Sequence, residues 1–320
     1  MYCPLILTVE GVRWGEVEEA LRTILGVSNT RNGSDLQARD SDGEFTEPVH
    51  QSRKRRHGFE KGSDEDKRRK SKWEIISGKI SKLLEETAIC PLEAIKNEWC
   101  FIRDMDLTDP LHAQYVNKSI EIWSQKINRW SLREYFEMYQ RTNPDELIFS
   151  KSKSYMPLKE SFDVIQKLLK FQFNDNDDEI KEFLQQLVNV VDRQPEGNPG
   201  VNIKTNTFLV HSQPSAGKNF FFDTLFTLLL NFGQLGTANK SNNFAFQDAA
   251  NRRIILWNEP NYESSMTDYL KTLFEGGDTK VRVKMQGDTH VQRTPIIILT
   301  NNVVNFMVDN AFKDRIKQYK

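Results

Sequence analysis

The stretch LVHSQPSAGKNFFFD, residues 209–223, places a Gly-Lys pair between an apolar strand pattern and an apolar helical pattern. A phosphate-binding loop has the pattern G-x-x-x-x-G-K-[ST] in this context. Gly217 and Lys218 match it, whereas Ser212 replaces the first glycine and Asn219 replaces the Ser or Thr. In such a loop the helix N-terminus and its amides attract phosphate, and the lysine adds a positive charge. Because an accidental Gly-Lys pair would rarely lie at this junction, we expect a nucleotide loop.

The segment after residue 200 alternates between strand and helix patterns. The runs TNTFLVHS, RRIILWNEP and IIILTNN are strand-like, and the helical patterns GKNFFFDTLFTLLLNF and SSMTDYLKTLFEGG lie between them. Apolar strands that alternate with helices are typical of a parallel sheet covered by helices. The segment TKVRVKMQGDTHVQRTP alternates with a period of two around a turn, which predicts a β-hairpin. We therefore expect an α/β fold with a parallel central sheet and a hairpin.

Two of the expected strands end in polar residues that suit phosphate chemistry. Glu259 ends IILWNE, and a carboxylate at a strand end can orient or deprotonate water or hold Mg²⁺. Asn258 stands where a second acid would complete the pair, and a strand-end glutamate alone is usually only solvated. Asn301 and Asn302 end IIILTNN, where an amide can bind a γ-phosphate or simply terminate the strand.

Basic residues gather on the expected hairpin. The segment 278–293 contains four basic and two acidic residues: Lys280, Arg282, Lys284, Arg293, Asp278 and Asp288. Positive side chains flanking a hairpin tip can follow the phosphates of a nucleic acid strand. The alternative is a surface hairpin with ordinary charges.

The N-terminal part differs in composition from the rest. Only 38% of the chain is apolar, which is low for a chain that is compact along its whole length. Residues 1–26 indicate a short strand followed by a helix, whereas residues 27–72 contain few aliphatic side chains. Since burial cannot offset the ordering entropy there, we expect a disordered linker. Its basic clusters, Arg53–Arg56 and Lys67–Lys70, fit a bipartite nuclear-import signal. A solvated charged linker, or direct contact with DNA phosphates, is the alternative.

Helical patterns dominate residues 73–199. The runs WEIISGKISKLLEE and DEIKEFLQQLVNVVD repeat aliphatic residues at helical spacing. Asp177 or Asp178 is expected to cap the second helix, and RQPEGNPG is expected to end it.

Composition excludes several other classes of protein. The three cysteines form no C-x-x-C pair, so neither a disulfide framework nor a zinc site is expected. No apolar run reaches the ~18 residues of a membrane span, and the first residues lack a signal-peptide pattern. The net charge of −1 gives no information about nucleic acid for the chain as a whole.

The order of these motifs resembles the superfamily 3 helicase module of parvovirus non-structural replication proteins. The nucleotide loop, LWNE, the hairpin, LTNN and DR follow one another at close spacing, and SAGKNFFFD with LWNEP is most similar to insect densoviruses. The resemblance covers about residues 200–320. It implies a P-loop ATPase of the AAA+ type with a parallel central sheet, preceded here by the helical region and the disordered basic linker.

The resemblance also assigns roles to residues. It implies an ATP loop made of Ser215, Ala216, Gly217, Lys218 and Asn219, with Mg²⁺ held by Asn219 and Glu259. The implied catalytic residues are Lys218, Glu259, the sensor Asn302 and the arginine finger Arg315, which would act on a neighbouring subunit's nucleotide. The implied ligands of single-stranded DNA are Lys284 and His290, to which the charge pattern adds Lys280 and Arg282.

The function that follows is an ATP-dependent DNA helicase of viral genome replication. We expect it to form a ring, a hexamer, that moves along single-stranded DNA in the host nucleus, with residues 73–199 as the oligomerisation collar and a nuclear import receptor as a further partner. The family's origin-nicking domain requires two histidines that flank one apolar residue. The histidines at 50, 57, 112, 211 and 290 form no such pair, so no nicking is expected, and QYVNK is expected to be helical surface. The module is expected to be truncated soon after Arg315.

Two other functions remain open at this point. Because Ser212, Asn219 and Asn258 depart from the pattern, the chain could be a decayed remnant that binds nucleotide, DNA and its own copies without turnover. A monomeric P-loop kinase for a small metabolite would leave the hairpin, the sensor asparagine and Arg315 unexplained.

Overall fold

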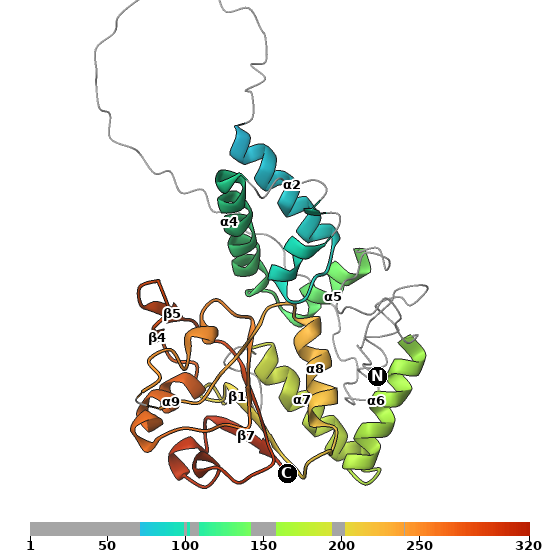
Figure 1. Cartoon of the computed structure of the whole chain (residues 1–320). Coiled ribbons are helices and arrows are strands. Elements are labelled where there is room, and N and C mark those ends of the chain that lie inside the picture. The colour runs from blue at the N-terminus through green and yellow to red at the C-terminus, as the bar shows by residue number, and fades with distance from the viewer. Residues whose placement is uncertain (1–70, 99–100, 103–108, 142–157, 194–201, 240) are drawn as a thin grey trace, which may run out of the picture.

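The computed structural model describes residues 71–98, 101–102, 109–141, 158–193, 202–239 and 241–320 (Figure 1). The expected strand and helix of residues 1–26, and nearly all of the linker with both basic clusters, lie outside the described residues. No helix in the part of the chain that the structure describes is long and apolar enough to cross a membrane.

The first described elements form a helical subdomain at one end of the molecule (Figure 1). It contains α2 (Lys72–Glu86), the 3₁₀ helix η1 (Leu92–Asn97), α4 (Pro110–Ile127) and α5 (Leu132–Arg141). A capping box starts α2, because the Glu74 amide donates to Ser71 Oγ (3.2 Å) and the Ser71 amide donates to the Glu74 carboxylate (2.6 Å). The helix therefore begins at Lys72, one residue before the expected boundary at 73.

The helices α6 (Leu158–Gln172) and α7 (Asp177–Val191) pack beside the sheet. The cap of α7 is Asn176, whose Oδ1 accepts from the amides of Asp178 and Glu179 at 3.2 and 3.3 Å. The expectation that Asp177 or Asp178 caps this helix was wrong. Both lie inside the first turn, where their negative charges interact favourably with the positive end of the helix dipole.

The central sheet has five strands in the order β2-β3-β6-β1-β7, and every neighbouring pair is parallel. The strands are β1 (Thr207–His211), β2 (Phe232–Gln234), β3 (Ile254–Asn258), β6 (Ile296–Thr300) and β7 (Ile316–Tyr319). The predicted α/β fold with a parallel central sheet is thereby confirmed. The edge strands β2 and β7 were not predicted, because β2 is only three residues long and β7 has the mixed sequence IKQY.

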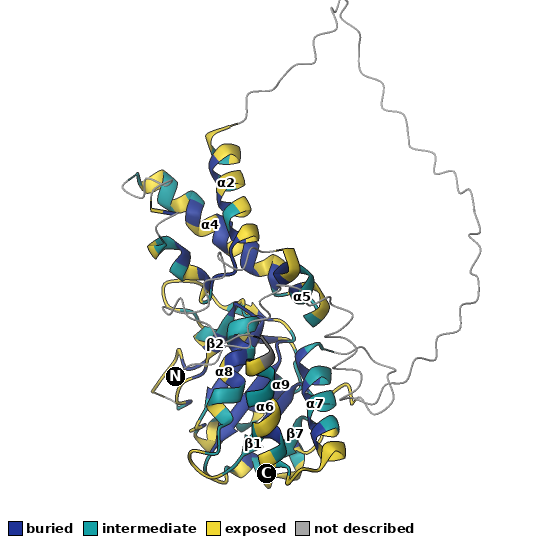
Figure 2. Cartoon of the chain, turned by 90° about the vertical axis from the view of Figure 1, so that its right-hand side faces the viewer, coloured by how far each residue is buried: buried dark blue, intermediate teal, exposed yellow. Residues whose placement is uncertain are grey.

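Alternate residues of the central strands enter different cores, since successive side chains of a strand point to opposite faces. Phe208 and Ile297 lie in the core beneath α7 and α8 (Lys218–Leu228), whereas Leu209 and Ile298 lie in the core beneath α9 (Thr267–Phe274). Figure 2 shows that the middle of the sheet is buried on both sides. Short 3₁₀ helices complete this layer: η3 (Gln247–Ala249), η4 (Ser264–Met266), η5 (Asn305–Met307) and η6 (Asn310–Phe312).

The expected hairpin is confirmed as the antiparallel pair β4 (Thr279–Val281) and β5 (Thr289–Val291). Val281 and Val291 are buried in the core beneath α9. Lys280 lies directly opposite His290, and both side chains are exposed on the outer face.

The helical subdomain and the sheet share one hydrophobic core. This core contains Ile80 of α2 and Tyr135 of α5 together with Phe222 of α8 and Ile297 of β6. Polar contacts join the two parts as well, because the buried side chain of Arg253 donates to the carbonyls of Trp130 (3.1 Å) and Val191 (2.8 Å). The core is therefore continuous across residue 200, and a collar formed by residues 73–199 stays a prediction.

Candidate active site

The loop between β1 and α8 has a backbone conformation that requires a glycine at residue 217. Gly217 is the N-cap of α8 with φ of 86°, in the left-handed region that favours glycine. A Cβ at this position would lie 2.9 Å from Cδ1 of Leu168 on α6. The first amides of a helix have no intrahelical partner and carry the positive end of its dipole. The loop therefore presents its amides at the carboxyl end of β1, as an anion site requires.

Lys218 is the first residue of α8, and its ammonium group lies back over the loop. It donates to the Ser212 carbonyl (3.0 Å), Ser212 Oγ (3.0 Å), the Gln213 carbonyl (3.2 Å) and Oδ1 of Asn301 (2.7 Å). Partial burial lowers the pKa of Lys218, and the negative charge of Glu259 acts in the opposite direction. The residue that departs from the loop pattern, Ser212, thus supplies two of the lysine's acceptors.

Glu259 follows directly on β3. In the sheet, β6 lies between β3 and β1, the strand that leads into the loop. Its carboxylate accepts from the backbone amide of Asn301, at 3.0 Å to Oε1 and 3.2 Å to Oε2. Its amide donates to the Leu299 carbonyl at 2.8 Å, and its φ of 47° is in the left-handed region. This rare conformation for a residue with a side chain turns the chain at the strand end.

Asn301 connects the acid and the lysine. Its side-chain oxygen accepts from Lys218, while its backbone amide donates to Glu259. Asn302, which the resemblance assigns as the sensor, is exposed, and its amide donates to Thr300 Oγ1 at 3.1 Å. Both asparagines follow the predicted strand in the sequence, and the sensor role of Asn302 stays a prediction.

The expected magnesium ligands have suitable chemistry. Asn219 is exposed on the first turn of α8, and Glu259 is exposed at the end of β3. Amide and carboxylate oxygens are the protein ligands that Mg²⁺ prefers, usually one or two alongside phosphate oxygens and water. In the described residues, no cluster of three His, Cys, Asp or Glu side chains could hold a metal. The oxygens of Asn219 and Glu259 would suit a magnesium ion only if phosphate and water supplied its remaining ligands.

Arg315 lies away from this site, immediately before β7, where the strand's amino end lies at the opposite edge of the parallel sheet. Its guanidinium forms an ion pair with Glu275 (2.8 Å) and donates to the carbonyls of Lys271 (3.1 Å) and Ala311. The structure thus ties this side chain to its own protomer. Its assignment as a finger stays a prediction.

The hairpin presents the expected basic residues to solvent. Lys280, Arg282, Lys284 and His290 are all exposed, and Nδ1 of His290 lies 2.9 Å from Oδ1 of Asp278. Met285 at the tip has a φ of 62° and is 97% exposed.

Comparison with known proteins points to one viral family. Residues 199–318 match the family described as parvovirus non-structural protein NS1. Over 257 residues the chain is 48% identical to the initiator protein NS1 of Junonia coenia densovirus and 47% identical to that of Diatraea saccharalis densovirus. Each alignment covers 78% of this chain and 46% of the relative, so the chain spans about half the length of these relatives. The resemblance seen in the motifs is thereby confirmed.

Among solved structures, the chain is similar to one described as JCV helicase. The TM-score is 0.46 at 13% sequence identity, and the alignment covers 78% of this chain and 76% of that chain. The C-terminal region of NrS-1 gives a TM-score of 0.37 at 15% identity, over 54% of this chain and 41% of that one.

Proposed function

We propose that this chain is an ATP-dependent DNA helicase module that acts in viral genome replication. The observation that supports this best is the chain of contacts from Lys218 through Asn301 to Glu259 at the carboxyl edge of the sheet. A basic amine, an amide and a carboxylate from three different segments meet beside a helix N-terminus with a left-handed glycine cap. The similarity to initiator proteins of densoviruses favours replication over metabolism as the setting.

Residues 215–219 would hold the triphosphate of ATP. The amides at the start of α8 would bind phosphate oxygens, and Lys218 would exchange its neutral acceptors for the β- and γ-phosphates. Mg²⁺, held by Asn219 and Glu259, would neutralise phosphate charge when bound. Glu259 would also orient the attacking water, because Asn301 fixes its carboxylate at the strand end.

Asn301 would report the state of the nucleotide to the strand. Its side chain binds Lys218, whose partners must change when phosphate occupies the loop. We keep Asn302 as the second candidate for this role, because it follows directly on the same strand end.

A ring, a hexamer by family resemblance, would place Arg315 against the nucleotide of the next protomer. For this, the guanidinium would leave or share its ion pair with Glu275. In Figure 1, α2 and α4 extend away from the sheet, whereas α5 lies where this subdomain meets α8, so α2 and α4 are the best-placed part of a collar.

Single-stranded DNA would contact the outer face of the hairpin, where Lys280, Arg282, Lys284 and His290 are exposed. Replication in the host nucleus, and import through the basic clusters of residues 53–70, complete the proposal. A catalytically decayed remnant is the less favoured alternative, because Lys218, Asn301 and Glu259 are still arranged together.

The test is ATP hydrolysis by the Lys218→Ala variant. We expect turnover to be abolished, since the only charged group of the loop is removed. Lys313→Ala, an exposed lysine beyond the site, should retain wild-type turnover. Undiminished hydrolysis by Lys218→Ala would exclude the assigned loop. Binding of ATP by the wild-type chain with no release of phosphate would instead favour the decayed remnant.

A further inference from the structure

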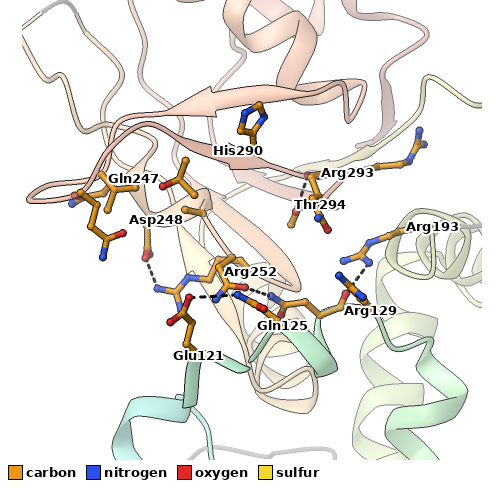
Figure 3. Close-up of a pocket in the computed structure, with 17 residues that line it drawn as sticks. Glu121, Gln125, Arg129, Arg193, Gln247, Asp248, Arg252, His290, Arg293 and Thr294 are labelled. Carbon is orange, nitrogen blue, oxygen red and sulfur yellow. Dashed lines mark hydrogen bonds and ion pairs between the residues drawn. The ribbon is translucent and has the colours of Figure 1, made fainter. Parts of the chain in front are cut away.

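A pocket of about 800 Å³ lies between the end of α4, Arg193 shortly after α7, the segment 247–252 and the β4–β5 hairpin (Figure 3). Its volume is within the usual range for ligand sites. No residue of the nucleotide loop lines it. Its described walls are polar and rich in arginine, with Arg129, Arg193, Arg252 and Arg293 around the cavity and His290 above it from the hairpin.

The acidic residues of the pocket are already engaged. Asp248 forms an ion pair with Arg252 at 2.7 Å, and Glu121 forms one with Lys118 at 2.9 Å. Within the described part of the chain, no carboxylate lies within ion-pair distance of Arg129, Arg193 or Arg293. The pocket therefore has three arginines whose charge its own walls do not balance.

Arg193 is held in position as a binding group. Its Nη1 donates to the Asn128 carbonyl (2.8 Å) and its Nη2 to the Arg253 carbonyl (3.1 Å), which fixes the plane of the guanidinium. Its buried Nε has no hydrogen-bond partner among the described residues. Burial lowers the pKa of Arg193 to about 10; the positive charges of Arg253 and Arg293 act in the same direction, and the neighbouring Asp192 acts in the opposite one. An anion in the pocket would satisfy the donor and offset this repulsion.

The other two arginines approach from different elements. Arg129 follows α4 and is exposed, and Arg293 follows β5, where its Nη2 donates to the Thr205 carbonyl at 3.1 Å. Each keeps guanidinium N–H groups for a further acceptor, since this side chain has five. Planar guanidinium groups suit phosphate oxygens, to which they can donate two parallel hydrogen bonds.

We propose that this pocket binds phosphate groups of a single DNA strand that runs from the hairpin toward α4, through Arg129, Arg193 and Arg293. The inference rests on the proposed function, and adds to it a DNA contact outside the hairpin. Its continuity with the hairpin comes from His290, which belongs to the outer face of β5 and also lines the pocket. The strand would thus pass from the hairpin to a surface shared by the helical subdomain and the sheet.

DNA suits the pocket better than a segment of a neighbouring protomer. Protein interfaces have apolar and aromatic cores, whereas only Ala250 and Val283 are apolar among the described lining residues. Side-chain amides and hydroxyls such as Gln125, Gln286 and Thr289 line much of the remainder. Polar groups of this kind, together with arginines, are the usual ligands of phosphate and sugar.

The experiment measures binding of fluorescently labelled oligo(dT) to the full chain by anisotropy, between about 50 and 200 mM salt. Arg129→Gln is the main variant, because no side-chain partner of Arg129 would be lost with it among the described residues. Arg133→Gln is the matched control. Arg133 is an exposed arginine four residues further along the chain, but it lies on α5, pairs with Glu137 and does not line the pocket. Lys284→Ala tests the hairpin in the same assay.

Arg129→Gln should flatten the dependence of log Kd on log salt by about 0.7 and weaken binding about fivefold near 0.1 M salt, as expected for one phosphate contact. Adding Arg293→Gln should flatten the slope by about 0.7 again. Arg133→Gln should match the wild type in slope and affinity. ATP hydrolysis without DNA should be unchanged in Arg129→Gln, which shows that the fold and the nucleotide site are intact.

A wild-type slope in Arg129→Gln, alongside a flattened slope in Lys284→Ala, would overturn the pocket and leave the proposed function standing. A changed oligomer mass in Arg129→Gln, with the slope unaltered, would also overturn it, because a neighbouring protomer would then occupy the pocket. Absence of salt-dependent oligo(dT) binding by the wild type would overturn the inference and the DNA part of the proposed function together.

Discussion

Replacing Arg253 with methionine should destabilise the whole described structure, because this side chain joins the sheet to the helices. Arg253 is 1% exposed and lies immediately before β3. Its Nε donates to the Trp130 carbonyl, its Nη1 donates to the Val191 carbonyl, and its Nη2 lies 3.9 Å from the Asp192 carboxylate. The guanidinium also lies 5.9 Å from the ring centre of Tyr135.

The magnitude follows from the groups that would be left behind. A buried acceptor without a partner costs about 1–3 kcal/mol, and two carbonyls would lose their donor. Removing one member of a fully buried ion pair costs about 3–5 kcal/mol in total, which is an upper bound here because Asp192 is partly exposed and still accepts from the Leu132 amide. Methionine would regain part of this, because burial disfavours the charged guanidinium and lowers the pKa of Arg253. We therefore expect the free energy of unfolding to fall by about 2–4 kcal/mol.

The assay is urea unfolding followed by far-UV circular dichroism and by tryptophan fluorescence. Tryptophans lie in both parts, Trp73, Trp123 and Trp130 in the helical subdomain and Trp257 in the sheet, so a single transition that coincides by both methods would show that the two parts unfold together. The control is Arg133→Met, whose side chain is 73% exposed and should change stability by less than about 0.5 kcal/mol. A loss below about 1 kcal/mol in Arg253→Met, or two separate transitions in the wild type, would refute the reasoning.

The same variant has a defined pH dependence. Burial raises the pKa of Asp192, and the charge of Arg253 acts against that rise. Without Arg253 the folded-state pKa should rise further above the unfolded value, so the folded form binds a proton more tightly. Stability then increases as the pH falls through the folded-state pKa of Asp192. The deficit of Arg253→Met relative to the wild type should therefore be smaller at mildly acidic pH than at pH 7.

Two further predictions concern the nucleotide site. Gly217→Ala should weaken binding of a non-hydrolysable ATP analogue about 5- to 30-fold. A left-handed alanine costs about 1–2 kcal/mol, and its Cβ would meet Leu168. Calorimetry that shows wild-type affinity would contradict this. Asn301→Ala should reduce ATP turnover more than Asn302→Ala, because Asn301 contacts Lys218 at 2.7 Å. If Asn302→Ala showed the larger loss in a phosphate-release assay, Asn302 would be the sensor instead.

The central strands could be predicted because their apolar runs are long enough to be buried on both faces. The runs that became β1, β3 and β6 occupy the middle of the sheet, and the loop at Gly217 follows β1 as expected. The outer strands could not be predicted in this way. An edge strand is buried less and needs no uniform apolar run, which is why IKQY was not recognised as β7.

The details of the site depend on contacts between distant residues, and spacing alone does not give these. Two adjacent asparagines are equivalent in the sequence, and only the end of β6 decides that Asn301 faces Lys218. Arg315 looked free for a neighbouring subunit, because Glu275, its partner, lies in another helix–loop segment. The four pocket arginines, Arg129, Arg193, Arg252 and Arg293, come from four separate segments, so the sequence contained no local signal for them.

The two ends of α8 have different partners, and this has a mechanical consequence. Lys218 begins the helix at the nucleotide loop, and about 16 Å further on the tyrosine hydroxyls of α5 bind its final carbonyls. Tyr139 donates to the Leu228 carbonyl at 2.6 Å, and Tyr135 donates to the Leu229 carbonyl at 3.1 Å. Contacts with other segments therefore hold α8 at both of its ends. A shift of the loop along the axis of α8 would have to move α5 or break these two hydrogen bonds.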